Sequence, residues 1–222
     1  MEKIVYSENS KDVLKEMNIQ VSGLSKIETG AVLYSGCAVL GESVVKQGAV
    51  IGANSVVENS VVEENAEIQS SFVENSVVGE KSKVGPFAHI REKSFVGKNC
   101  RIGNFVEIKN SLVGDNTNIA HLTYVGDACV GKNCNIGCGV VFCNFNGETK
   151  NKIVVGDNVF VGSNVNLIAP VSVDKGAFIA AGSTINKNVA TNEFAIARAR
   201  QENKTGFDNP YKRRLKSKKL IK

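Results

Sequence analysis

Large aromatic anchors are almost missing from this chain of 222 residues. It has no Trp, and aromatic residues make up only 6 % of it, while Val and Ile carry much of the apolar content. Because β-branched residues favour extended structure, this composition favours strands over helices. No apolar run approaches the roughly 20 residues that span a bilayer. The start, MEKIVYSENSKDV, also lacks the apolar segment of a signal peptide. We therefore expect a cytoplasmic protein without a membrane span.

Cysteine pairs at close spacing are also lacking. The 6 cysteines form no CxxC motif, and the chain does not resemble a small secreted disulfide scaffold. Reduced thiols in a cytosolic protein fit this usage best.

The positive charge is concentrated at one end. The net charge is +5, and the tail KRRLKSKKLIK (212–222) holds seven Lys or Arg and no acid, so the rest carries −2 (5 − 7). A tail of this kind is a solvated end, an arm that meets a phosphorylated ligand, or a nucleic-acid contact. No aromatic residues are interleaved for base stacking, so we expect no nucleic-acid partner.

A six-residue repeat dominates the sequence. Aliphatic residues recur at intervals of six in three runs, and the interval shortens to five after Val57, Ile108 and Val125. The first run is Ile27, Leu33, Val39, Val45, Ile51 and Val57, and the second is Val78, Val84, Ile90, Val96, Ile102 and Ile108. The third run is Val155, Val161, Leu167, Val173, Ile179 and Ile185. This period fits a short strand, a corner and a repetition, and three such sides close a triangular coil of about 18 residues. The repeat has room for roughly nine coils, but it does not decide their handedness.

Two segments interrupt the repeat, and they set the predicted organisation. SKDVLKEMNIQ, before residue 20, predicts a short helix, and CNFNGETKNK (143–152) is too long for one turn and predicts a projecting loop. We predict an N-terminal segment over residues 1–25, a β-solenoid over 26–190, and a C-terminal arm and basic tail over 191–222.

His121 is the side chain of most chemical interest. It lies two residues past the inward Ile119, which places it near a corner, facing outward, with Asn104 and Cys138 as its neighbours one coil away on either side. A largely neutral imidazole takes a proton from an attacking amine or hydroxyl. A histidine satisfied within the core is the alternative.

Cationic residues follow the same stretch of the repeat. Arg91, Lys109, Lys150 and Lys152 are suited to an anionic substrate, with Tyr124 close to His121 in the sequence. Each lysine alone is ordinarily a solvated surface charge. Glu107, beside Lys109, is a hypothetical partner that orients the imidazole.

A metal site is not expected. His89 and His121 are too far apart for neighbouring coils and too few for a three-histidine zinc site. The evenly spread Cys129, Cys134, Cys138 and Cys143 fall at different corners and depths of the coil, which does not suit a shared zinc ion.

Several phrases carry a family resemblance. GPFAHIRE, IGNFVEIK, AHLTYVGD, NCNIGCGVVFCNFNG, VGDNVFVGSNVNLIAPVSV, FIAAGSTI and AIARARQ resemble the acetyltransferase half of the bifunctional N-acetylglucosamine-1-phosphate uridylyltransferase/glucosamine-1-phosphate acetyltransferases, over about residues 27–207. The resemblance implies a left-handed parallel β-helix, a homotrimer with sites between neighbouring prisms, and acetyl transfer from acetyl-CoA to the amine of glucosamine-1-phosphate.

The same resemblance assigns residues to roles. His121 matches the general base. The residues that match sugar-phosphate contacts are Arg91, Lys109, Tyr124, Asn135 and Lys150. The residues that match acetyl-CoA contacts are Cys138, Asn144, Phe145, Ser163, Ala181 and Arg198.

Departures from the family pattern leave alternatives open. Cys138 stands where Ala is usual, Phe145 where Tyr is usual, Asn146 where Asp is usual and Ala120 where Gly is usual. Glu92 replaces the usual Pro after Arg91, and an acid there weakens phosphate binding.

No phosphate loop of a nucleotidyltransferase precedes the repeat, so we expect no uridylyl transfer. The expected protein is a free-standing acetyltransferase, a paralogue acting on another amino sugar, or a catalytically silent trimeric scaffold with a separate uridylyltransferase as partner.

Overall fold

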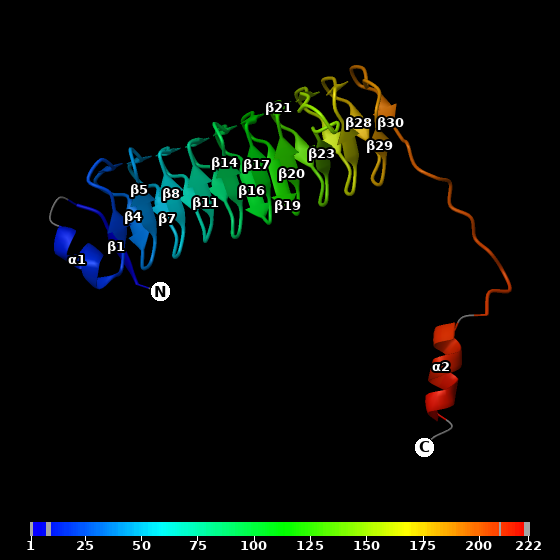
Figure 1. The fold of residues 1–222 in the computed structure, drawn as a ribbon, viewed down its shortest axis with the longest axis horizontal. Coiled ribbons are helices and arrows are strands. Elements are labelled where there is room, and N and C mark those ends of the chain that lie inside the picture. Colours follow the sequence, from blue (N-terminus) through cyan, green and yellow to red (C-terminus); the bar gives the residue numbers. More distant parts are fainter. Residues whose placement is uncertain (1, 8–9, 209, 220–222) are drawn as a thin grey trace.

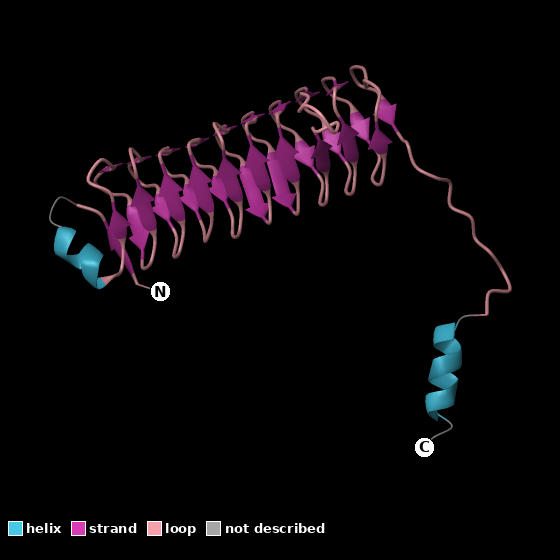
Figure 2. Ribbon diagram, in the orientation of Figure 1, coloured by secondary structure: helices cyan, strands magenta, loops and turns pink. Residues whose placement is uncertain are grey.

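The chain forms a three-sided prism of stacked coils in the computed structural model (Figure 1). The structure describes residues 2–7, 10–208 and 210–219. Each coil contributes one short strand to each of three sheets, and the neighbours within a sheet are parallel apart from the β1–β4 pair. The solenoid expected from the repeat is confirmed, and the described coils are nearly free of helix (Figure 2).

Sheet A has 11 strands, in the order β1 Lys3–Val5, β4 Val32–Tyr34, β7 Val50–Ile51, β10 Glu67–Ile68, β13 Lys83–Val84, β16 Arg101–Asn104, β19 Asn118–His121, β22 Asn135–Ile136, β25 Phe160–Val161, β28 Phe178–Ile179 and β30 Phe194–Ala195. Sheet B has 10 strands, in the order β2 Gln20–Val21, β5 Ala38–Leu40, β8 Val56–Glu58, β11 Phe72–Glu74, β14 His89–Arg91, β17 Glu107–Lys109, β20 Tyr124–Gly126, β23 Val141–Cys143, β26 Asn166–Ile168 and β29 Thr184–Ile185. Sheet C has 9 strands: β3 Lys26–Ile27, β6 Val44–Val45, β9 Val61–Val62, β12 Val77–Val78, β15 Phe95–Val96, β18 Leu112–Val113, β21 Ala128–Val130, β24 Ile153–Val155 and β27 Val171–Val173.

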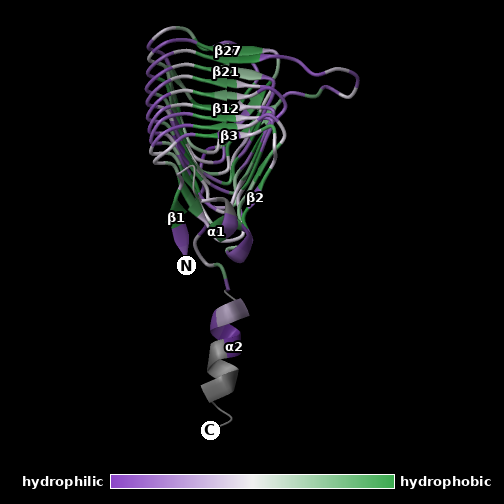
Figure 3. Cartoon of the chain, turned by 90° about the vertical axis from the view of Figure 1, so that its left-hand side faces the viewer, coloured by the Kyte–Doolittle hydropathy of each residue, from purple (hydrophilic) through white to green (hydrophobic). Residues whose placement is uncertain are grey.

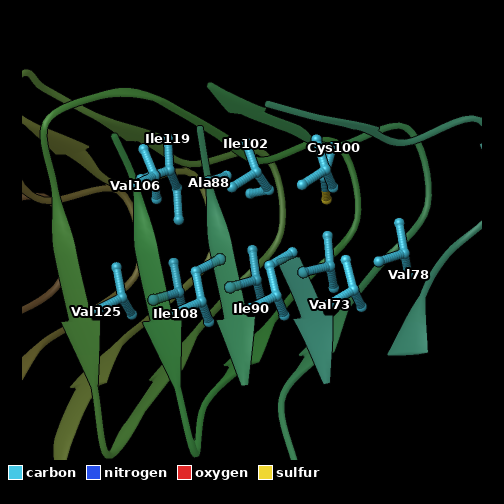
Figure 4. Packing of buried hydrophobic residues seen from close by; sticks show 14 of the residues in the cluster. Val73, Val78, Ala88, Ile90, Cys100, Ile102, Val106, Ile108, Ile119 and Val125 are labelled. Carbon is cyan, nitrogen blue, oxygen red and sulfur yellow. The ribbon is translucent and has the colours of Figure 1, made fainter. Parts of the chain in front are cut away.

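The repeated aliphatic residues fill the prism as predicted. Val73, Ile90, Ile108 and Val125 stack one above another on consecutive coils of sheet B, each fully buried (Figure 4). Ile27 is the exception among the predicted inward positions, since it is only partly buried. It lies on β3, the end strand of sheet C, which has a neighbour on one side only.

Buried hydroxyl groups tie successive corners together. The backbone N–H groups of Ser76, Ser94 and Ser111 donate to the hydroxyl of the serine one coil earlier, at 3.1–3.4 Å, beginning at Ser60. Among the residues that the structure describes, no buried side-chain N or O atom lacks a hydrogen-bond partner. Small polar residues therefore form the corners without leaving a buried side-chain polar atom unpaired. Their hydrogen bonds from coil to coil keep the outward side chains in register.

The interruptions lie where the sequence predicts them. Helix α1, Lys11–Glu16, precedes the first coil. The loop 144–152 leaves the prism between β23 and β24, at the corner between sheets B and C, and is largely hydrophilic (Figure 3).

The C-terminal end contains more structure than we predicted. Strand β30 adds to sheet A beyond Asn188, where the sequence repeat ends. An arm then leads away to helix α2, Pro210–Lys219, which stands apart from the prism (Figure 1). Within the described residues, no helix is both long and apolar enough to cross a membrane. Residues 220–222 of the basic tail lie outside the described residues.

Candidate active site

One corner of the prism, where sheet A passes into sheet B, carries several of the predicted residues. Asn104 and His121 are direct register partners on β16 and β19. Backbone hydrogen bonds continue this line coil by coil, from Gly139 N to His121 O, from Asn164 N to Cys138 O and from Gly182 N to Ser163 O. We call Asn104, His121, Cys138, Ser163 and Ala181 the corner column. The neighbours predicted for His121, Asn104 and Cys138, are therefore correct.

The imidazole of His121 is exposed at this corner and held from one side. Its Nδ1 lies 2.9 Å from Asn104 Oδ1, so a proton on Nδ1 is donated to the amide oxygen and Nε2 keeps its lone pair. The hypothesis that Glu107 orients the imidazole is wrong. Glu107 Oε1 instead accepts a hydrogen bond from Arg91 Nε at 2.8 Å and forms an ion pair with Arg91 Nη2 at 2.7 Å.

A cationic group lies at the other end of the sheet B strands. Arg91 and Lys109 are register partners on β14 and β17, and Lys109 is 6 % exposed. Hydrogen bonding with Lys150, and after it with Glu92, raises the pKa of Lys109, whereas the contact with Lys109 lowers the pKa of Lys150. We call Arg91, Lys109 and Lys150 the basic cluster. An anion bound between Lys109 and Lys150 would favour the charged ammonium form of both side chains.

Tyr124, on the next strand of sheet B after Lys109, contacts the projecting loop. The amide Nδ2 of Asn144 donates to the Tyr124 hydroxyl at 3.2 Å and to Asp127 Oδ2 at 2.6 Å. Asn144 is 7 % exposed, so its amide is directed toward these groups of its own chain. Gly126 makes the arrangement possible, because a Cβ there would lie 2.3 Å from the Tyr124 hydroxyl and 2.6 Å from Asn144 Nδ2.

The remaining predicted residues are spread along the same coils. Asn135 points outward on β22 in register with Phe160. Phe145 is 60 % exposed on the loop and forms an isolated antiparallel bridge with Lys150. Arg198 Nη1 donates to Ala181 O at 3.0 Å, which brings the segment after β30 to the corner column.

A cavity of about 440 Å³ opens under the loop. Its lining includes Lys93, Asp127, Cys129, Lys150 and Lys152. Over the described ranges, no three His, Cys, Asp or Glu side chains gather closely enough to hold a metal ion.

The sequence did not predict the contacts of three further residues near the corner column and the basic cluster. Asn104 was identified as a neighbour of His121 but not as its hydrogen-bond partner. Asp127 joins Asn110 and Asn144 through its two carboxylate oxygens. Glu92, named only as a departure, contacts both Arg91 and Lys109. The register of the coils places Asn104 beside His121, but the repeat does not show the side-chain direction at a corner, on which the hydrogen bond depends.

Two family models match parts of the chain. The model described as GMPPB C-terminal domain matches residues 21–99, and that of the bacterial transferase hexapeptide (six repeats) matches residues 152–187. The UDP-N-acetylglucosamine acyltransferase of Francisella novicida has a similar fold, with a TM-score of 0.68 at 22 % identity over 74 % of this chain and 66 % of that one. A second such acyltransferase, from Campylobacter jejuni, aligns with a TM-score of 0.52 at 21 % identity, over 86 % of this chain and 81 % of that one. These likenesses show the left-handed β-helix fold.

Curated relatives are considerably more similar in sequence. The bifunctional protein GlmU of Clostridium novyi is 46 % identical over 202 residues, which is 91 % of this chain and 44 % of that protein. GlmU of Clostridium kluyveri is 42 % identical over 212 residues, 96 % of this chain and 46 % of that protein. The chain thus spans less than half the length of these relatives. It belongs to the hexapeptide-repeat acyltransferase family, as a homologue of the C-terminal half of bifunctional GlmU.

Proposed function

We propose that the chain is an acetyl-CoA-dependent N-acetyltransferase that converts glucosamine-1-phosphate to N-acetylglucosamine-1-phosphate, on the route to UDP-N-acetylglucosamine. The observation that carries this proposal is the placement of His121 at one end of the sheet B face and of the basic cluster at the other. Strand β20 has three residues, so the face is about 7 Å wide between its first and last Cα atoms. His121 lies beyond the first of these atoms, across the corner, so a phosphorylated hexosamine would lie along this face with its amine toward His121 and its phosphate toward Arg91 and Lys109.

His121 acts as the general base in this proposal. Nε2 accepts a proton from the amine as the nitrogen attacks the thioester carbonyl of acetyl-CoA. The N–C bond forms, the C–S bond breaks, and the proton passes from the imidazole to the thiolate of the leaving CoA. Asn104 supports this role because it occupies Nδ1 and leaves Nε2 as the basic nitrogen. No covalent enzyme intermediate is required.

The corner column supports an extended co-substrate. Cys138, Ser163 and Ala181 continue from His121 along the prism axis, and Arg198 joins them at the far end. We propose that acetyl-CoA lies along this line with its thioester at His121, also contacted by Asn144 and Phe145 from the loop. Asn135 completes the sugar-phosphate site. We further propose that three copies assemble, with neighbouring prisms closing the site.

The cytoplasm is the proposed location. All 6 cysteines are free thiols, which fits a reducing compartment. Acetyl-CoA and a sugar phosphate are both cytoplasmic metabolites.

The test is an acceptor panel with acetyl-CoA, read as release of CoA thiol. Glucosamine-1-phosphate should be acetylated, and His121→Ala should lose about a hundredfold or more in kcat. His89→Ala is the matched control, because it removes the only other histidine, which pairs with Glu74. Equal turnover by wild type and His121→Ala contradicts the role of His121.

A second candidate function is acetylation of a different amino sugar. It is favoured by Glu92, since this carboxylate already pairs with the cations assigned to the phosphate. Turnover of another amine on the same panel, without turnover of glucosamine-1-phosphate, would establish it. Inactivity on the whole panel, with no binding of acetyl-CoA in calorimetry, would favour a silent scaffold.

A further inference from the structure

The corner that follows Arg91 differs from its neighbours along sheet B. Five residues separate the inward positions at Val73–Val78 and Ile108–Val113, whereas six separate Ile90 from Val96. The shorter corners turn through one left-handed residue, Asn75 or Asn110, but the longer one has two in succession, Glu92 with φ 52° and Lys93 with φ 60°. Positive φ is uncommon for such side chains. The corner after Arg91 therefore differs from the corners on the adjacent coils in both length and backbone conformation.

The carboxylate of Glu92 contacts both Arg91 and Lys109, which come from adjacent coils. Its Oε2 is 3.2 Å from Lys109 Nζ, and its Oε1 accepts a hydrogen bond from Arg91 Nη1. Lys109 is almost fully buried, while the Glu92 side chain is 53 % exposed. The buried cation is thus fixed, and the carboxylate reaches it from the solvent side. This is the approach that the anionic group of a substrate would also take.

The charged groups around Arg91 and Lys109 decide whether Glu92 and a substrate phosphate can be bound there together. Glu107 holds Arg91 from the opposite side through two nitrogens. Arg91, Lys109 and Lys150 with Glu92 and Glu107 carry a formal net charge of +1, and displacement of Glu92 leaves the remaining four groups at +2. A phosphate monoester carries about −1.5 to −2 at pH 7. The site therefore matches a phosphorylated acceptor only after Glu92 has moved away.

We propose that Glu92 is a specificity-determining residue of the acceptor site. Its carboxylate occupies the place of the acceptor's phosphate between Arg91 and Lys109, so that a phosphorylated amino sugar must displace it and an unphosphorylated one need not. Glu92 thereby reduces the preference of the site for phosphorylated acceptors. This inference rests on the proposed function, because it concerns the same two cations.

The decisive variant is Glu92→Gln, which keeps the shape of the side chain and removes its charge. A charge this close to an anion, in a partly exposed position, changes its affinity by about tenfold. Calorimetry with inorganic phosphate should therefore give a Kd about tenfold lower for Glu92→Gln than for wild type. The KM for glucosamine-1-phosphate should fall by a similar factor at unchanged kcat, while the KM for glucosamine stays the same.

Matched controls separate this effect from a general change in surface charge. Glu80→Gln removes a carboxylate that also pairs with two lysines, Lys81 and Lys98, and it should leave the phosphate affinity unchanged. Lys109→Met in the Glu92→Gln background should abolish the gain. Equal or weaker phosphate binding by Glu92→Gln overturns the proposal, and so does the absence of phosphate binding in both proteins. Failure of acetyl transfer alone overturns the proposed function, whereas the phosphate titration tests the role of Glu92 independently of turnover.

Discussion

Asn104 is the side chain whose hydrogen bond orients the imidazole of His121 in the described part of the chain. Because its Oδ1 lies 2.9 Å from Nδ1, we predict that Asn104→Ala lowers kcat about tenfold through loss of the required tautomer and orientation, with little change in KM. Asn104→Asp retains an acceptor oxygen and adds a charge that stabilises the imidazolium. That variant should therefore recover part of kcat and move the acid limb of the pH–rate profile to higher pH.

Steady-state rates over a range of pH check this prediction. Asn118→Ala removes an exposed amide from the same coil as His121 and serves as the control. A profile that is identical in the Asn104→Asp variant and in wild type would show that Asn104 does not act through the imidazole.

How far the sequence predicts this site depends on whether a position is set by backbone register or by side-chain direction. The six-residue period places His121 outward at a corner between Asn104 and Cys138, and the structure agrees. It could not predict that Glu107 turns toward Arg91, because that choice depends on the reach of a guanidinium from the preceding coil. It could not predict the paired contacts of Glu92 either: the extra residue between Ile90 and Val96 is visible in the sequence, but the two left-handed conformations that direct the Glu92 side chain toward Arg91 and Lys109 are not.

Strand β20 and the loop that follows β23 depend on each other through Gly126. A Cβ at this position would lie 2.3 Å from the Tyr124 hydroxyl and 2.6 Å from Asn144 Nδ2. We predict that Gly126→Ala displaces both side chains and raises about tenfold the KM for the acceptor, which Tyr124 is proposed to contact, and the KM for acetyl-CoA, which Asn144 is proposed to contact.

Fluorescence of the Tyr side chains and thermal unfolding, measured beside the kinetics, separate a local change from a general one. Gly23→Ala is the control, because nothing lies within 4 Å of a Cβ there. Unchanged kinetic constants in Gly126→Ala would mean that Tyr124 does not position the acceptor and that Asn144 does not position acetyl-CoA.

The stability of the whole prism should decrease at alkaline pH because of its buried thiols. Burial raises the pKa of Cys37 from 9.0 to about 11, and burial also raises the pKa values of Cys100 and Cys134. The folded state therefore binds the thiol proton more tightly than the unfolded state. This contribution is complete below pH 9 and is lost as pH rises from about 9 to 11, on the order of 2 kcal/mol for Cys37.

Chemical denaturation between pH 8 and 11 measures this loss. Cys37→Ala should flatten the decline relative to wild type, and the fold should tolerate alanine there, because the fully buried Ala31 and Ala49 occupy the same position of the six-residue repeat, at corners that lead into sheet A. Parallel curves for the two proteins would contradict the assignment to Cys37.

Assembly of the molecule is expected to involve the apolar residues beside the corner column. Phe87, Phe105 and Leu122 are each more than half exposed and have positive φ, and the rings of Phe87 and Phe105 stack 5.6 Å apart. Large side chains in this backbone conformation are disfavoured in a single chain. Their contact with a second copy, next to His121, would explain both the exposure and the conformation.

Phe105→Asn tests this explanation, because asparagine is favoured at positive φ and removes the ring. We predict that wild type sediments at three times the 23.7 kDa chain mass, and that Phe105→Asn shifts toward the monomer and loses acetyl transfer while its fold is retained in circular dichroism. Phe207→Asn, on the arm and 75 % exposed, should remain trimeric and active. A trimeric Phe105→Asn variant with full activity would place the contact between copies on another face of the prism.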